Sequence, residues 1–180
     1  NANTKISKAI DIIKNHYRNN QQWIVYTDNA SQVKSIRDKL KNEGIESMEY
    51  YSYSDSDGPS VLKQFQELGG ILVSIRCLDE GVNIPSIDNG LFVASTMNSR
   101  QFIQRRGRIL RKHKNKTFAN IYDLTVLPKK EDYLAEGDLL LPIFRAELTR
   151  QMEFGYLSIN NSYFDNDLNQ ILKTYNITKN

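Results

Sequence analysis

The chain of 180 residues has few of the groups that stabilise small secreted or metal-bound domains. Its single cysteine, Cys77, excludes an internal disulfide and any cysteine-rich metal site. Because only His16 and His113 accompany that cysteine, we expect no metal site. The length suffices for one domain with a hydrophobic core, or for one domain with a helical appendage.

Long apolar runs are also missing. No run approaches the ~20 residues that a membrane-spanning helix needs, and residues 1–4 lack the basic-then-apolar pattern of a secretory signal. We therefore expect a cytoplasmic protein without membrane contact.

The usual phosphate-binding motifs are absent as well. There is no Gly-x-x-x-x-Gly-Lys-[Ser/Thr] loop, and Asp79-Glu80 resembles a magnesium-binding Asp-Glu-x-His/Asp box only as a dipeptide. We therefore predict that this chain alone does not bind Mg-ATP productively and has no ATPase activity.

Positive charge is concentrated in one segment. The net charge is only +3, yet eight of the 24 lysines and arginines lie between Arg100 and Lys116, where there is no acidic residue. A solvated basic face is one interpretation, and a surface that binds a polyanion is the other.

Apolar periodicity predicts alternating helices and strands, followed by helices only. We expect helices at 4–18, between Ser31 and Gly44, at 61–68 and at 100–112, with Ser31 and Ser99 as N-caps. We expect strands at 23–27, 45–51, 71–75, within 88–94 and at 117–126. This order predicts an α/β fold, a parallel sheet with helices on both faces, whose ligands bind beyond the carboxyl ends of the strands. The rest predicts a C-terminal helical extension.

The strongest functional signal is the sequence Gln-Arg-Arg-Gly-Arg-Ile-Leu-Arg at residues 104–111. On a helix, Gln104, Arg108 and Arg111 stand at i, i+4 and i+7, which places them on one face. Arginine stays ionised and binds phosphate through two parallel hydrogen bonds, and Gly107 would permit a close approach. The alternative is an ordinary surface salt-bridge helix.

This sequence resembles motif VI of superfamily 2 helicases, above all the DEAD/DEAH-like branch of DNA-repair helicases and restriction-enzyme motor subunits. The resemblance implies a second RecA-like motor domain over residues 1–128 and a helical extension over 129–180. It implies that Arg108 and Arg111 are arginine fingers on the γ-phosphate of ATP, with Gln104 near that phosphate or the attacking water. ATP and Mg²⁺ would be held by an N-terminal RecA-like domain of the same parent chain.

Residues 71–85 resemble motif V of the same family, a strand followed by a loop. The resemblance implies that Glu80, Gly81 and Asn83 face the nucleotide and that Ser74 or Arg76 contacts a nucleic-acid phosphate. Two positions depart from the family pattern. Ile75 replaces the usual threonine, and Asn83 replaces the usual aspartate, whose carboxylate accepts hydrogen bonds more strongly than an amide.

Two further segments carry weaker resemblances. Residues 24–28 resemble motif IV, which implies that Thr27 and Asp28 contact the nucleic-acid backbone. Residues 95–100 resemble the segment before motif VI, where Thr96 and Ser99 would contact phosphates, although Ser99 is equally well explained as a helix cap.

Two functions remain open from the sequence. The first is half of an ATP-dependent helicase or translocase that acts on nucleic acid, on DNA more than on RNA. The second is a non-catalytic helicase-like module that binds nucleic acid or protein. Ile75 and Asn83 favour the second slightly, whereas the intact Gln104, Arg108 and Arg111 favour the first. An unrelated phosphate-binding α/β domain is a remote third possibility.

Overall fold

The computed structural model of the chain describes residues 2–51, 57–75, 84, 86–93, 99–114, 116–135 and 137–177. Five predicted site residues, Arg76, Glu80, Gly81, Asn83 and Thr96, lie outside these ranges. The chain forms two compact units, Asn1–Leu124 and Thr125–Asn180. The sequence had placed the division after residue 128.

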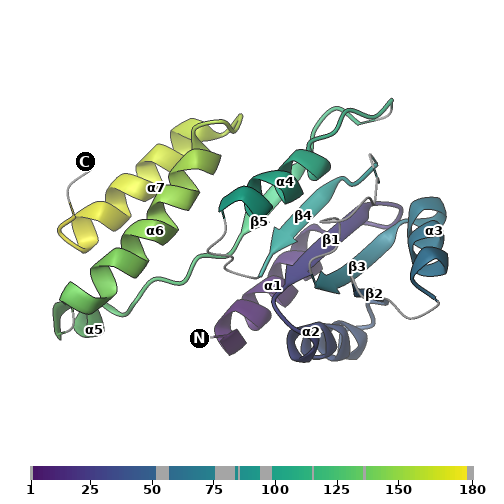
Figure 1. The fold of residues 1–180 in the computed structure, drawn as a ribbon, viewed down its shortest axis with the longest axis horizontal. Helices are drawn as coiled ribbons and strands as arrows, with labels where there is room; N and C mark the ends of the chain where they lie inside the picture. The colour runs from purple at the N-terminus through teal and green to yellow at the C-terminus, as the bar shows by residue number, and fades with distance from the viewer. Residues whose placement is uncertain are drawn as a thin grey trace. The chain divides into compact units, whose positions relative to one another are not determined.

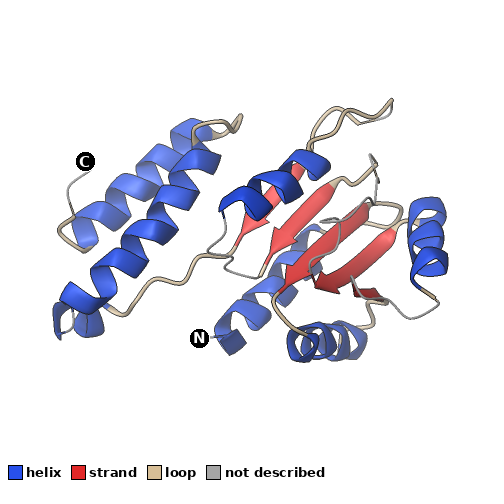
Figure 2. Cartoon of the chain, viewed as in Figure 1, coloured by secondary structure: helices blue, strands red, loops and turns tan. Residues whose placement is uncertain are grey.

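The first unit is built around one parallel sheet (Figures 1 and 2). Its helices are α1 (Ala2–His16), α2 (Ala30–Asn42), α3 (Gly58–Leu68) and α4 (Ser99–Ile109). Its strands are β1 (Gln22–Thr27), β2 (Met48–Tyr51), β3 (Gly70–Ile75), β4 (Asn89–Phe92) and β5 (Asn120–Asp123). The strands lie in the order β2-β3-β1-β4-β5, and every neighbouring pair is parallel. The expected α/β fold is therefore confirmed.

One face of the sheet, here called the scaffold face, is covered by α1 and α2. Side chains alternate between the two faces of a strand, and the apolar residues on this side are Trp23, Val25, Ile71, Val73, Leu91 and Val93. The helices contribute residues at helical spacing, namely Ile6, Ala9, Ile10 and Ile13 of α1 and Val33, Ile36 and Leu40 of α2. All of these side chains are buried, so this face supplies the main hydrophobic core.

The opposite face, here called the site face, packs against α3 and α4. The Gln22 side chain donates to the carbonyls of Phe65 and Gln66 at 3.0 and 3.1 Å, which fastens the C-terminal end of α3 beneath the sheet. A Cβ atom on Gly90 would lie 2.2 Å from Cδ1 of Ile109. The absence of a side chain at this point of β4 therefore leaves the space that α4 fills, and helices cover both faces as expected.

The start of α2 differs from the prediction. Asn29 is the N-cap, with an extended backbone and a side-chain Oδ1 that accepts a hydrogen bond from the Gln32 amide at 3.0 Å. The helix therefore begins at Ala30. Ser31, the predicted cap, lies inside the helix. Both residue types are good caps, and the choice depends on where the chain leaves β1.

The second unit consists of α5 (Lys130–Ala135), α6 (Gly137–Gly155) and α7 (Asn161–Thr174). Its small core joins Phe144 and Leu148 of α6 to Leu168 and Leu172 of α7. The helical extension is therefore confirmed. Across the described part of the chain, no helix has both the length and the apolar character that crossing a membrane requires.

Candidate functional site

Helix α4 is anchored to the site face at two points. Near its middle, the guanidinium carbon of Arg105 lies 5.3 Å from the centroid of the Tyr26 ring, and that ring stacks on Phe92 at 4.8 Å. One turn later, Ile109 occupies the space above Gly90. Arg105 is 3% exposed and Ile109 is fully buried. Because residues four apart share a helix face, these two contacts fix the rotation of α4 about its axis.

The other side of α4 is open within this unit. Gln104 is exposed and Arg108 is half-buried, and the two lie four residues apart in the same helix. A Cβ atom on Gly107 would meet nothing within 4 Å, while Ile103 is 47% exposed. The missing side chain at Gly107 therefore serves no packing purpose within the first unit.

Arg111 does not belong to the helix, contrary to the prediction of a helix over 100–112. The amide of Leu110 still bonds to the Arg106 carbonyl at 3.0 Å, but the Arg111 amide turns to the Arg108 carbonyl, three residues back, at 3.4 Å. The Lys116 ammonium then donates to the carbonyls of Ile109 and Arg111. These two carbonyls accept hydrogen bonds from the Lys116 side chain. Because the helix ends at Ile109, the argument that placed Arg111 on one helix face with Gln104 and Arg108 was wrong.

The carboxyl ends of β1 and β3 bring two predicted nucleic-acid residues together. The hydroxyl of Thr27 donates to the carbonyl of Ser74 at 3.1 Å, and both side chains are buried. Asp28 is exposed, and its amide donates to the Gln32 side chain at 2.9 Å. Of these three side chains, only that of Asp28 is therefore exposed.

Ser99 is the first residue of α4. The predicted contacts Arg76, Glu80, Gly81 and Asn83 follow β3 in sequence, and Thr96 follows β4, outside the described residues.

Sequence reasoning missed Arg105. It lies between the predicted site residue Gln104 and the second of three arginines, and it was treated as part of a general basic cluster. Its spacing from Ile109 does not single it out, because Arg106 stands at the same spacing before Leu110, which is 51% exposed.

The first unit coincides with a known domain family. The family model for the helicase conserved C-terminal domain matches residues 4–113. The chain belongs to this family. It carries the C-terminal, RecA-like domain of superfamily 2 helicases, as the arginine motif implied.

Several related proteins agree with this placement. A Methanocaldococcus jannaschii protein assigned by name to the ATP-dependent RNA helicases is 27% identical over 127 residues, which cover 65% of this chain and 16% of that protein. The helicase domain of Pyrococcus furiosus Hef shares the fold with a TM-score of 0.54 and 24% identity, over 74% of this chain and 28% of that helicase-domain chain. Domain 2 of the DEAD-box helicase Mss116p, bound to an RNA duplex, gives a TM-score of 0.58 and 22% identity, over 68% of this chain and 50% of that one.

These comparisons do not support the expected preference for DNA. The archaeal relative is named for RNA, and the Mss116p structure contains RNA. The chain also spans only about a sixth of the archaeal relative's length, so the activity of a whole helicase is a matter for proposal.

Proposed function

We propose that this domain completes the ATP site of a helicase or translocase. Arg108 and Arg111 would act as arginine fingers on the γ-phosphate of ATP, which is held with Mg²⁺ by an N-terminal RecA-like domain, and Gln104 would lie beside the attacking water. The observation that carries the proposal is the two-sided construction of α4. Arg105 and Ile109 fix one side to the sheet, and Gln104 and Arg108 stand elsewhere on the same short helix.

An arginine finger depends on rigid placement. Donors that already point to where charge develops cost no reorganisation in the transition state, and fingers contribute about 10³–10⁵ in rate in other nucleotide hydrolases. A helix anchored at two points supplies this rigidity to Arg108. Arg111 lies beyond the helix, and the Lys116 ammonium supports its main chain instead.

The carboxyl edge of the sheet is the proposed nucleic-acid track. Glu80, Gly81 and Asn83 would face the nucleotide, and Thr27, Asp28, Ser74, Arg76, Thr96 and Ser99 would line the track. Since Thr27 and Ser74 are buried, we expect main-chain amides to make most phosphate contacts there. Such contacts do not read bases, so the track would accept DNA or RNA of any sequence.

The test is an ATPase assay on a protein that carries both motor domains. We expect Arg108→Ala to lower kcat by at least ~10², because it removes charge stabilisation formed in the transition state. Arg108→Lys should rescue poorly, since it lacks the bidentate fork. Lys39→Ala, an exposed change on α2, is the matched loss of one positive charge.

Two results would contradict the proposal. One is near-normal turnover in Arg108→Ala at unchanged thermal stability. The other is ATP hydrolysis by the 180-residue chain alone that Arg108→Ala abolishes. Tight nucleic-acid binding that is unaffected by ATP and by the Arg108→Ala change would instead favour the non-catalytic module, which is the alternative that Ile75 and Asn83 favour.

A further inference from the structure

The segment after α4 carries part of the positive charge of this unit and lies away from the carboxyl edge of the sheet. We call residues 112–118 the basic hairpin. It begins just after α4 ends beside Gly90, and it leads into β5, where the Asn120 amide donates to the Asp88 carbonyl at 2.9 Å. The strands of Figure 2 point away from this loop, so it lies at the amino edge of the sheet.

The basic hairpin is tied to the domain by one of its own lysines. The backbones of His113 and Lys116 form an antiparallel bridge, and the Lys116 amide donates to the His113 carbonyl at 3.1 Å. The Lys116 ammonium is bound to carbonyls at the end of α4. Burial lowers the pKa of Lys116, and the negative charge of Asp88 opposes this shift. Lys116 therefore holds the hairpin against the end of α4.

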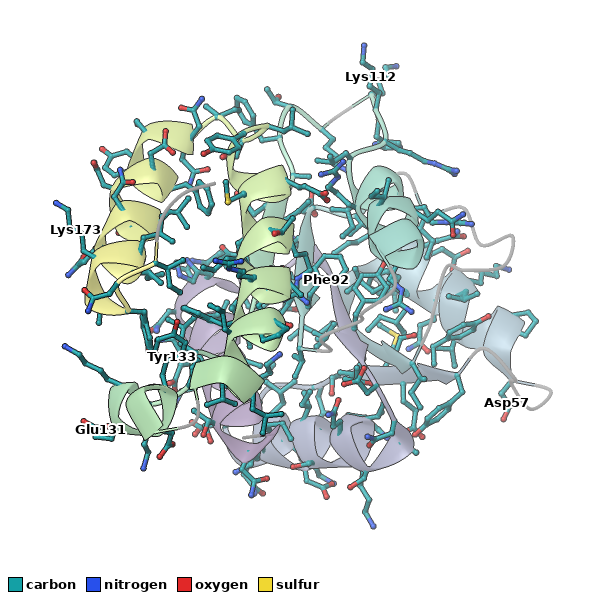
Figure 3. The ribbon with its side chains drawn as sticks, turned by 60° about the vertical axis from the view of Figure 1, so that its left-hand side comes forward. Asp57, Phe92, Lys112, Glu131, Tyr133 and Lys173 are labelled. Carbon is teal, nitrogen blue, oxygen red and sulfur yellow. The ribbon has the colours of Figure 1, made fainter. Side chains whose placement is uncertain are left out.

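Other described side chains of the hairpin face solvent. Lys112 and Lys114 are exposed, and Figure 3 shows Lys112 extending away from the ribbon. Phe118 is 66% exposed. No acidic residue occurs from Arg100 to Asn120, so the segment's own sequence contains no carboxylate to neutralise its lysines.

Exposed cations beside an exposed aromatic ring match the chemistry of single-stranded nucleic acid. Lysines neutralise phosphates, and an aromatic ring stacks on an unpaired base of any identity. A duplex stacks its bases internally, so it offers Phe118 no unpaired base. At full extension the six peptide steps from Lys112 to Phe118 span at most about 20 Å, which is the scale of a few nucleotides.

We propose that the basic hairpin is a second contact for single-stranded nucleic acid, in which Lys112 and Lys114 hold phosphates and Phe118 stacks on a base. The inference rests on the proposed function only in that the domain works on nucleic acid. It places a strand contact at the sheet edge opposite the proposed track.

The test measures the 180-residue chain binding a fluorescently labelled oligo(dT) by anisotropy at several salt concentrations. Neutralising one phosphate contributes about 0.7 to the slope of log K against log salt for single strands. Lys112→Ala/Lys114→Ala should therefore lower that slope by about 1.4. Phe118→Ala should weaken binding about 5- to 150-fold with little change in slope, and Phe118→Trp should retain affinity.

Matched controls separate the hairpin from general charge and apolar surface. Lys34→Ala/Lys41→Ala removes two exposed lysines from α2 and should leave the slope unchanged. Tyr163→Ala removes a ring that is 73% exposed in the second unit and should leave affinity unchanged. Fluorescence of the single tryptophan, Trp23, confirms that each variant of the first unit remains folded.

Three results would overturn the inference. They are no binding at the lowest salt, an unchanged slope in Lys112→Ala/Lys114→Ala, and unchanged affinity in Phe118→Ala. Equal binding of duplex and single strand, with no effect of Phe118→Ala, would identify the hairpin as a general polyanion surface instead. None of these results depends on Arg108, so the finger proposal can fail or survive separately.

Discussion

The two faces of the sheet are packed by different chemistry. On the scaffold face, α1 and α2 meet the strands mainly through apolar side chains, with an ion pair between Arg37 of α2 and Glu49 of β2 and a ring contact between His16 of α1 and Tyr122 of β5. On the site face, α4 meets them through a guanidinium on an aromatic ring and an isoleucine over a glycine, and α3 is fastened by the amide of Gln22. The scaffold face tolerates any well-packed apolar set, whereas the contacts of α4 specify its rotation.

The two faces therefore contribute differently to the stability of the unit and to the orientation of its helices. Apolar contacts are non-directional and roughly proportional to buried area, so the scaffold face contributes stability without fixing an orientation. The contact of Arg105 with the Tyr26 ring and the fit of Ile109 above Gly90 each require one orientation of α4. The residues proposed to act on ATP belong to the helix that is held in this second way.

The largest expected effect is on the scaffold face. Ile36→Ala, at a fully buried position of α2, should lower the free energy of unfolding by about 2–5 kcal/mol. Urea titration followed by Trp23 fluorescence measures it, because this tryptophan reports on the first unit. Ile103→Ala, at a 47% exposed position of α4, should change stability by no more than about 0.5 kcal/mol. Similar losses in both variants would remove the distinction between packed and open surfaces.

An intermediate effect is expected where α4 crosses β4. Gly90→Val places atoms where Ile109 lies, and such overpacking costs about 1–3 kcal/mol. Adding Ile109→Ala should recover part of that loss, so the double variant should be more stable than the sum of the single changes predicts. Strict additivity in the same urea titrations would show that the two residues do not share this space.

Gly107→Ala is the matched glycine control. Its new Cβ meets nothing in the first unit, so alanine should be neutral or should stabilise α4 by up to about 1 kcal/mol. If the same change slows ATP hydrolysis in a two-domain protein, the open side of α4 approaches its partner closely.

A further effect concerns the buried arginine. A double-mutant cycle of Arg105→Ala with Tyr26→Leu should give a coupling energy of about 0.5–2 kcal/mol, the range of a cation–π contact. The cycle of Arg108→Ala with Tyr26→Leu should give almost none, since the inward position is that of Arg105. Equal coupling in the two cycles would show that either arginine can contact the Tyr26 ring. In that case α4 would lack a fixed rotation about its axis.

Much of the fold followed from periodicity. Alternating apolar strands and amphipathic helices predicted the parallel sheet, and each strand was found within a few residues of its expected position. Helix ends were less accurate, because caps depend on tertiary contacts. Asn29 replaced Ser31 as the N-cap of α2, and the ammonium of Lys116, seven residues beyond Ile109, bonds the carbonyls at the end of α4.

The candidate site was only partly accessible from the sequence. The motif singled out Gln104 and Arg108, and both are found on α4. It gave no means of distinguishing Arg105, because three arginines in four positions look alike until the sheet beneath them is known. Nor could it show that Thr27 and Ser74 bond to each other, since strand register joins residues 47 positions apart.

The sequence by itself determined the family, the alternation of elements and the density of positive charge after residue 100, because local periodicity and motif spacing express these properties. Only the tertiary structure decided which arginine turns inward, where α4 stops, and which lysine of the basic hairpin is bound internally. Each of these depends on a contact that no local pattern expresses: Arg105 with Tyr26 and Ile109 with Gly90 join distant segments, and Lys116 reaches back seven residues to the Ile109 carbonyl. Burial against those partners assigns different roles to side chains that are chemically alike.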